Sequence, residues 1–173
     1  MEDSNAPIFL SLRQAIEELV PPLDAAIAEL PSERIVRARN GLELIMSELT
    51  MLAVILTNVD YRVSAEELAV INDMRRVVYG EESPSFTAQD YKDLCRQYLA
   101  LYPKGILTLD ALPDSIEFLL LYDQAHGTAY AAKARDLFIR FTEEIVRADQ
   151  NKDSIESIVV LNIKDVLIGA PST

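Results

Sequence analysis

Apolar residues recur at helical spacing along most of the chain. In the first such stretch they lie mostly three or four residues apart, which places them on one face of a helix: Ile8, Leu12, Ala15, Ile16 and Leu19. No segment shows the strict alternation of apolar and polar residues that is typical of a half-buried strand. The sequence therefore predicts an all-α protein, a compact bundle of about seven or eight helices.

Prolines, glycines and capping residues divide this pattern into elements. Pro21-Pro22 is expected to end the first helix, because proline removes a backbone donor and clashes with the preceding turn. A helix is predicted over 33–58, and its apolar second half should be central in the core. The remaining helices are predicted over 23–30, 65–79, 87–101, 113–126, 129–148 and 154–168. We expect one domain over 8–168, with tails at 1–7 and 169–173.

One stretch of the chain occurs twice. Residues 60–80 and 149–169 align without a gap, and the positions that they share include Asp60/Asp149, Glu67/Glu156 and Gly80/Gly169. Each copy follows an apolar, helix-like run. The alignment predicts two pseudo-symmetric helix–loop–helix repeats, each with a short acidic loop.

The charge composition restricts the kinds of molecule that the protein is expected to bind. Asp plus Glu number 28 against 16 Lys plus Arg, which gives a net charge of −12. A field of this sign repels nucleic acid and anionic membranes, and it attracts cations and basic protein surfaces. No apolar run is long enough for a membrane span, and the N-terminus is acidic where a signal peptide would be basic. We therefore expect a cytoplasmic protein with a protein partner of unknown identity, and a homo-oligomer is compatible with these features.

The acidic loops supply the candidate metal ligands, which are Asp60, Glu67, Asp149, Asp153 and Glu156. Two interpretations stay open. In the first, the loops only turn the chain and cap helices, because Ser64-x-x-Glu67 is a capping box and Asp153-x-x-Glu156 is the same device. In the second, the carboxylates of both loops gather around a divalent cation, for which Ca²⁺, Mg²⁺ or Mn²⁺ suits oxygen ligands best and Zn²⁺ is compatible.

The second loop also matches part of a calcium-binding pattern. Residues 149–153 read D-x-N-x-D, as at the start of an EF-hand loop. Ser154, Glu156 and Val160 then stand where an EF-hand needs Gly, an apolar residue and a bidentate Glu. The sequence therefore does not predict an EF-hand, and a weaker cation loop stays open.

Residues 60–67, which follow an apolar helix containing Ala53, resemble the D-G-x-[I/V]-S-x-x-E signature of TerB-like tellurite-resistance domains, and 149–156 would be the second copy. Tyr61 and Gln150 stand where that family has Gly. The resemblance implies an all-helical fold with two repeats, an acidic metal-binding cluster, and a bacterial stress-response or signalling role. TerB-like domains also occur fused to J domains and ATPases, so the resemblance is compatible with a domain of a larger protein. If the acidic loops only cap helices, the alternative is a purely structural or regulatory interaction domain with no metal site.

The residues that usually carry catalysis are sparse. His126 is the only histidine and Cys95 the only cysteine, so no nucleophile–base constellation, disulfide framework or zinc–thiolate cluster is expected. No phosphate-binding glycine loop is present in the sequence. We predict a non-enzymatic protein without catalytic or cofactor-binding residues. Metal-dependent phosphate-ester hydrolysis by the carboxylates is the least favoured alternative.

Overall fold

The computed structural model describes residues 6–30, 38–57, 63–80, 82–101, 109–148 and 154–169. This part of the chain contains no strand and forms seven helices: α1 (Ala6–Glu29), α2 (Gly41–Thr57), α3 (Ala65–Tyr79), α4 (Ala88–Leu101), α5 (Asp114–His126), α6 (Tyr130–Ala148) and α7 (Ser154–Gly169). The predicted all-helical fold is confirmed. Among the described helices, none combines the length and apolarity that a bilayer span requires.

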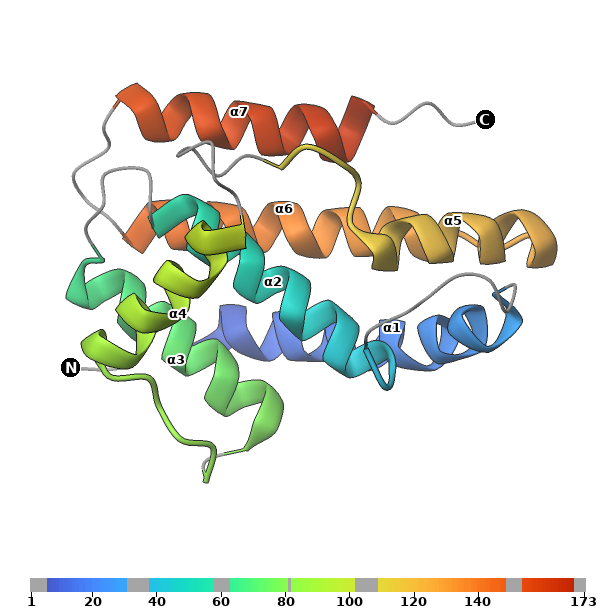
Figure 1. The fold of residues 1–173 in the computed structure, drawn as a ribbon. Helices are drawn as coiled ribbons and strands as arrows, with labels where there is room; N and C mark the ends of the chain where they lie inside the picture. Colours follow the sequence, from blue (N-terminus) through green and yellow to red (C-terminus); the bar gives the residue numbers. More distant parts are fainter. Residues whose placement is uncertain are drawn as a thin grey trace.

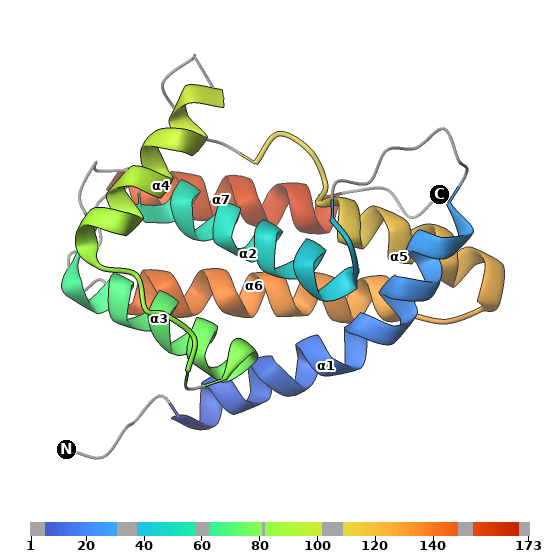
Figure 2. The ribbon, with the colours of Figure 1, turned by 60° about the horizontal axis from the view of Figure 1, so that its bottom comes forward.

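Helix α6 is the centre of the bundle. It packs against α1, α2, α3, α5 and α7, and Figure 1 shows α7 running along one side of it and α1 lying on the other. The side chains of Phe138 and Phe141 on α6 are fully buried. Helix α4 lies at one end of the molecule, where it contacts α2 and α3 (Figure 2).

Helix α1 continues through the two prolines that were expected to end it. Pro21 and Pro22 both lie inside the helix. The buried residues of α1 keep their spacing on both sides of the pair, because each of them faces the same core: Leu12, Ile16, Leu19, Leu23 and Ala26. Burying this continuous face outweighs the backbone bonds that the prolines remove. The ribbon changes direction along its length, as proline-containing helices do (Figure 2).

Helix α2 begins at Gly41, later than the predicted start at residue 33. The Asn40 side chain accepts a hydrogen bond from the Glu43 amide at 2.8 Å and caps the helix. The Gly41 amide donates to the Asp24 carboxylate at 2.6 Å, across the contact with α1. A Cβ atom at Gly41 would lie 3.1 Å from the Val20 carbonyl oxygen. Gly41 therefore permits a close helix crossing, which sets where α2 can start.

A tight connection joins α5 to α6. Gly127 adopts the left-handed conformation, with φ of 66°, and ends α5 directly after His126. The Asp123 carboxylate accepts the amides of Tyr130 at 2.9 Å and Ala131 at 2.8 Å, so it satisfies the first turn of α6. The Thr128 hydroxyl also donates to Asp123, at 2.6 Å.

The two predicted repeats correspond to α2–α3 and α6–α7. Helix α7 packs on α6 and also touches α2, while α3 packs on α1, α4 and α6. A twofold axis that relates the two repeats would make α3 contact α6 and α7 contact α2, and both contacts are present. The close α6–α7 pair has no counterpart of similar extent between α2 and α3. The pseudo-symmetric repeat therefore stays a prediction.

Candidate functional site

The acidic loops are only partly described. Asp60, Asp149 and Asp153 lie outside the described residues, and Glu156 lies in the first turn of α7, where its side chain is not described. Glu67 is 4% exposed and its carboxylate accepts the Ser64 amide at 2.8 Å. The Ser64 hydroxyl in turn accepts the Glu67 amide at 3.0 Å. The predicted capping box is confirmed, so the burial of Glu67 has a structural reason that needs no ion.

Within the described part of the chain, no group of three or more His, Cys, Asp or Glu side chains is placed to hold a metal ion. The five predicted ligands are therefore neither gathered nor separated by the structure, since three of them lie beyond that part and a fourth has no described side chain. Cation binding stays a hypothesis that rests on the sequence.

Metal addition during thermal unfolding tests this hypothesis directly. If the loops bind a cation, metal-stripped protein should gain about 2.7 kcal/mol of stability at a metal concentration 100 times the dissociation constant. The gain should disappear in Asp60→Asn and in Asp149→Asn. Melting curves with Ca²⁺, Mg²⁺, Mn²⁺ and Zn²⁺, added one at a time, measure it. An unchanged melting temperature with all four metals would leave only the capping role, for which Glu67→Ala should cost about 0.5–2 kcal/mol regardless of metal.

A buried carboxylate, which the sequence analysis missed, joins α2 to α5. Glu48 is 8% exposed and lies in the middle of α2. One of its oxygens accepts the Ser115 amide at 3.1 Å, and the other accepts the Ser115 hydroxyl. Ser115 is fully buried in the first turn of α5. The preceding N-cap residue, Pro113, makes no side-chain hydrogen bond to the helix, so Glu48 supplies the cap from another helix.

The surroundings of Glu48 oppose its ionisation. Desolvation by burial raises its pKa from 4.5 to about 7, although the hydrogen bonds from Ser115 act in the other direction. Glu48 is therefore a proton-binding group near neutral pH inside the core. A signal was present in the sequence, because Glu48 lies four residues from both Leu44 and Leu52 and so shares their helix face.

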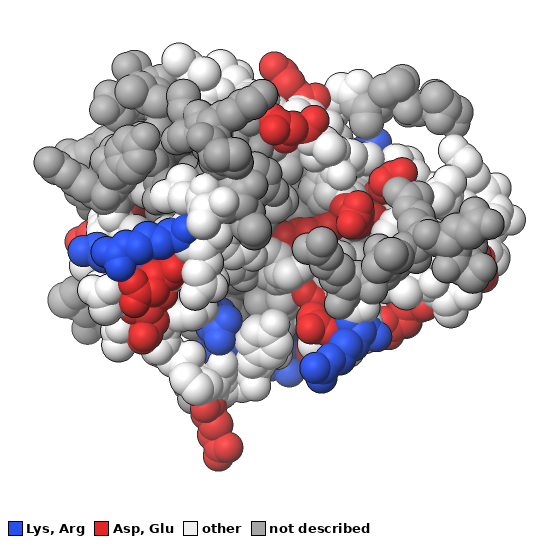
Figure 3. Space-filling view, in the orientation of Figure 1, with Lys and Arg blue, Asp and Glu red and all other residues white. Residues whose placement is uncertain are grey.

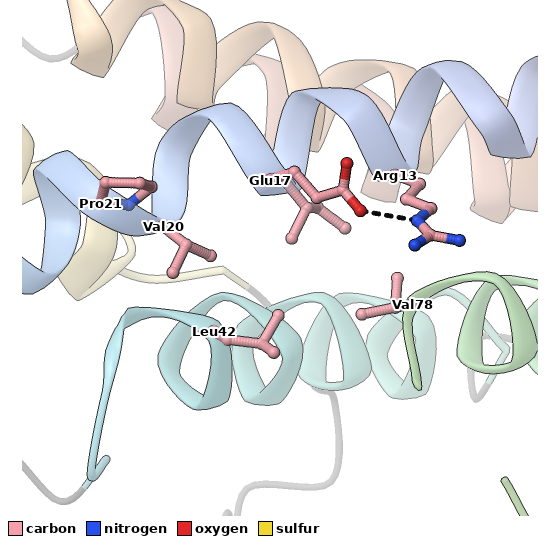
Figure 4. A pocket seen from close by; sticks show the side chains of 7 residues that line it. Arg13, Glu17, Val20, Pro21, Leu42 and Val78 are labelled. Atoms are coloured by element: carbon pink, nitrogen blue, oxygen red, sulfur yellow. Dashed lines mark hydrogen bonds and ion pairs between the residues drawn. The ribbon is translucent and has the colours of Figure 1, made fainter. Parts of the chain in front are cut away.

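A shallow apolar groove lies where α1, α2 and α3 meet. It has a volume of 270 Å³, and its walls include Val20, Pro21, Leu42 and Val78 (Figure 4). An ion pair of 2.7 Å between Arg13 and Glu17 lies at one side. This volume is below the usual range for cofactor and ligand pockets. The groove therefore suits a single apolar side chain better than a cofactor.

Helix α7 presents large apolar side chains on two opposite faces. Val159, Ile163 and Leu167 are buried against the bundle. On the outer face, Ile158, Leu161 and Ile168 are exposed by 64%, 60% and 65%. In the space-filling view, acidic and uncharged side chains lie at the upper edge, where α7 runs, and most basic side chains of this face lie lower down (Figure 3). The outer face of α7, defined by these three aliphatic residues, holds the three most exposed large apolar side chains of the described chain.

Comparison with known proteins adds no assignment. The chain matches no family model, and neither the curated proteins nor the solved structures contain a match to it. The resemblance to TerB-like domains therefore rests on the residues of the two acidic loops alone.

Proposed function

We propose that this chain is a non-enzymatic protein-binding module and that it contacts its partner through the outer face of α7. The observation that carries the proposal is the pair of apolar faces on this helix. One face anchors α7 to α6 and α2, and the other leaves Ile158, Leu161 and Ile168 each more than half exposed. A helix that is apolar on both sides is typical of a buried position.

The energetic argument follows from the exposure of these side chains. Burying a Leu or Ile side chain that would otherwise face water contributes about 1.5–3 kcal/mol. Ile158 and Leu161 lie on successive turns and Ile168 lies two turns further along the same face, and exposed apolar side chains that share one face mark a contact surface. In the isolated chain these side chains face water. A partner helix that covers them would therefore be held in the complex by their burial.

Two parts of the proposal come from the resemblance to TerB-like domains. The first is a stress-response or signalling role, and the second is a divalent cation at the acidic loops. The outer face of α7 bears on neither of them. The alternative is an interaction domain of a larger protein without a metal site, and it uses the same contact surface.

Site-specific photo-crosslinking tests the surface. A photoreactive amino acid in place of Leu161, in the full chain and in its native cells, should give a discrete crosslinked protein. The same group in place of Gln97, an exposed polar residue on α4, is the matched control and should give none. Adding Ile158→Ser and Ile168→Ser should reduce the crosslink at position 161 at least several-fold, because these changes remove the flanking apolar contacts.

The control for folding is the melting temperature of the same variants. All three residues on the outer face of α7 are exposed, so their replacement by Ser should leave the folded state intact. Equal crosslinking from positions 161 and 97, or a crosslink at 161 that is unaffected by the two Ser substitutions, would contradict the proposal.

A further inference from the structure

The residues on the outer face of α7 follow the spacing of a coiled-coil seam. Ile158, Leu161, Asp165 and Ile168 are separated by three, four and three residues, which is the a–d–a–d order of a heptad. Asp165 is exposed like the three aliphatic residues. The row is about 15 Å long at 1.5 Å per residue. Such a row is shaped for contact with another helix, because knobs at a and d positions fit between the side chains of a facing helix.

The position of Asp165 within this row restricts the partner. It occupies an a position, between Leu161 and Ile168, where a facing helix would bury it. A buried carboxylate without a counter-ion is costly. Lys164, the neighbouring cation on α7, already pairs with Glu143 at 2.7 Å on the side toward α6. A cation supplied by the partner would offset this cost.

A second copy of this chain that pairs through its own α7 does not supply it. In a parallel pair of α7 helices, a positions face each other and Asp165 would meet Asp165. In an antiparallel pair, a positions face d positions, so each Asp165 would be buried against a Leu161 without a cation. The net charge of −12 adds repulsion between copies. Both arrangements are disfavoured by the same residue.

We infer that the outer face of α7 pairs with an amphipathic helix of a basic partner protein, which places a Lys or Arg opposite Asp165 and aliphatic residues opposite Ile158, Leu161 and Ile168. This inference rests on the proposed function and names the chemistry of its partner. The charge pair selects the partner and its register, as a single polar a position does in coiled coils. The aliphatic residues supply the affinity.

Three designed helical peptides test the inference against the full chain. Each has about three heptads, with Leu and Ile at a and d positions; the central a position is Lys in the first, Glu in the second and Leu in the third. Fluorescence anisotropy should show the Lys peptide binding to the wild type at least 10-fold more tightly than the Glu peptide. Asp165→Lys should reverse that order. Leu161→Ser should weaken the Lys peptide roughly 10- to 100-fold, as expected for the loss of one buried leucine.

The possible outcomes distinguish a failure of this inference from a failure of the proposed function. Equal affinity for the Lys and Glu peptides, or an order that Asp165→Lys leaves unchanged, would overturn the basic helix as the occupant. If position 161 still crosslinks to a protein in cells, the proposed surface would nevertheless stand. Sedimentation of the wild type as a dimer that Leu161→Ser dissociates would show that a second copy covers the face, and would also overturn the inference.

Discussion

Replacing Glu48 by Gln is expected to remove about 3 kcal/mol of pH dependence from the free energy of unfolding, since the pKa of Glu48 is raised from 4.5 to about 7 in the folded protein. The folded state therefore holds this proton more tightly than the unfolded state does. The stabilisation that results is complete below pH 4.5 and is lost as the pH rises through 7. Gln mimics the protonated carboxyl, because its oxygen can accept the Ser115 amide and its amide group can donate to the Ser115 hydroxyl.

Urea unfolding at several pH values between 4.5 and 8.5, followed by circular dichroism, measures the effect. Wild type and Glu48→Gln should have similar stability at the acidic end, and the variant should be the more stable protein at pH 8. The difference between the two profiles is the relevant quantity, because the many surface carboxylates change the stability of both proteins with pH in the same way. Parallel profiles over the whole range would show that Glu48 does not take up a proton.

Replacing Ser115, the hydrogen-bond partner of Glu48, provides a second test of this contact between α2 and α5. Ser115→Ala removes a hydrogen bond that lowers the pKa of Glu48, so that pKa should rise further. The variant also leaves one buried carboxylate oxygen without its donor, which should cost about 1–3 kcal/mol, with the larger loss at pH 8. Ser47→Ala is the matched control, because Ser47 is exposed on α2 and its hydroxyl donates to the Leu44 carbonyl of its own helix. Its effect should be small at every pH.

Local features of the chain were predicted correctly from the sequence. The start of α3 follows from the predicted capping box of Ser64 with Glu67, and in the structure α4 begins with a similar box, Thr87 with Asp90. The end of α5 follows from Gly127, which has the positive φ that glycine tolerates. In these places the residues that decide the conformation are close together in the sequence.

The predictions that failed depend on residues far apart in the sequence. Pro21-Pro22 ends no helix, because the buried face of α1 continues past it against α5 and α6. The Gly41 amide at the start of α2 donates to Asp24, which belongs to another helix. Glu48 meets Ser115 across 67 positions of sequence. The periodicity of α7 predicted a helix, but only the packed structure shows which of its apolar faces is left exposed.

Tyr91→Ala is expected to cost about 3–5 kcal/mol, the range for removing a large aromatic side chain from a core. Tyr91 is the fully buried aromatic residue of α4, and the pKa of its hydroxyl is raised by burial. Its ring lies edge-on to Phe86 at 5.9 Å, and its hydroxyl is 3.1 Å from the Thr57 hydroxyl on α2. Urea unfolding measures the loss. Tyr91→Phe, the matched control, should cost only about 1 kcal/mol, because it keeps the ring and Thr57 still donates to the Ala53 carbonyl at 2.9 Å.

The position of α4 determines where that loss should appear. Among the described helices α4 packs closely only on α2 and α3, while α6 is held by five neighbours. In Tyr91→Ala the amides of α4 should therefore exchange with solvent at a lower opening free energy than those of α6, because α4 can detach while the rest of the bundle stays folded. Hydrogen exchange followed by mass spectrometry resolves the two helices. Equal acceleration in α4 and α6 would show instead that Tyr91 supports the whole core and that α4 does not open separately.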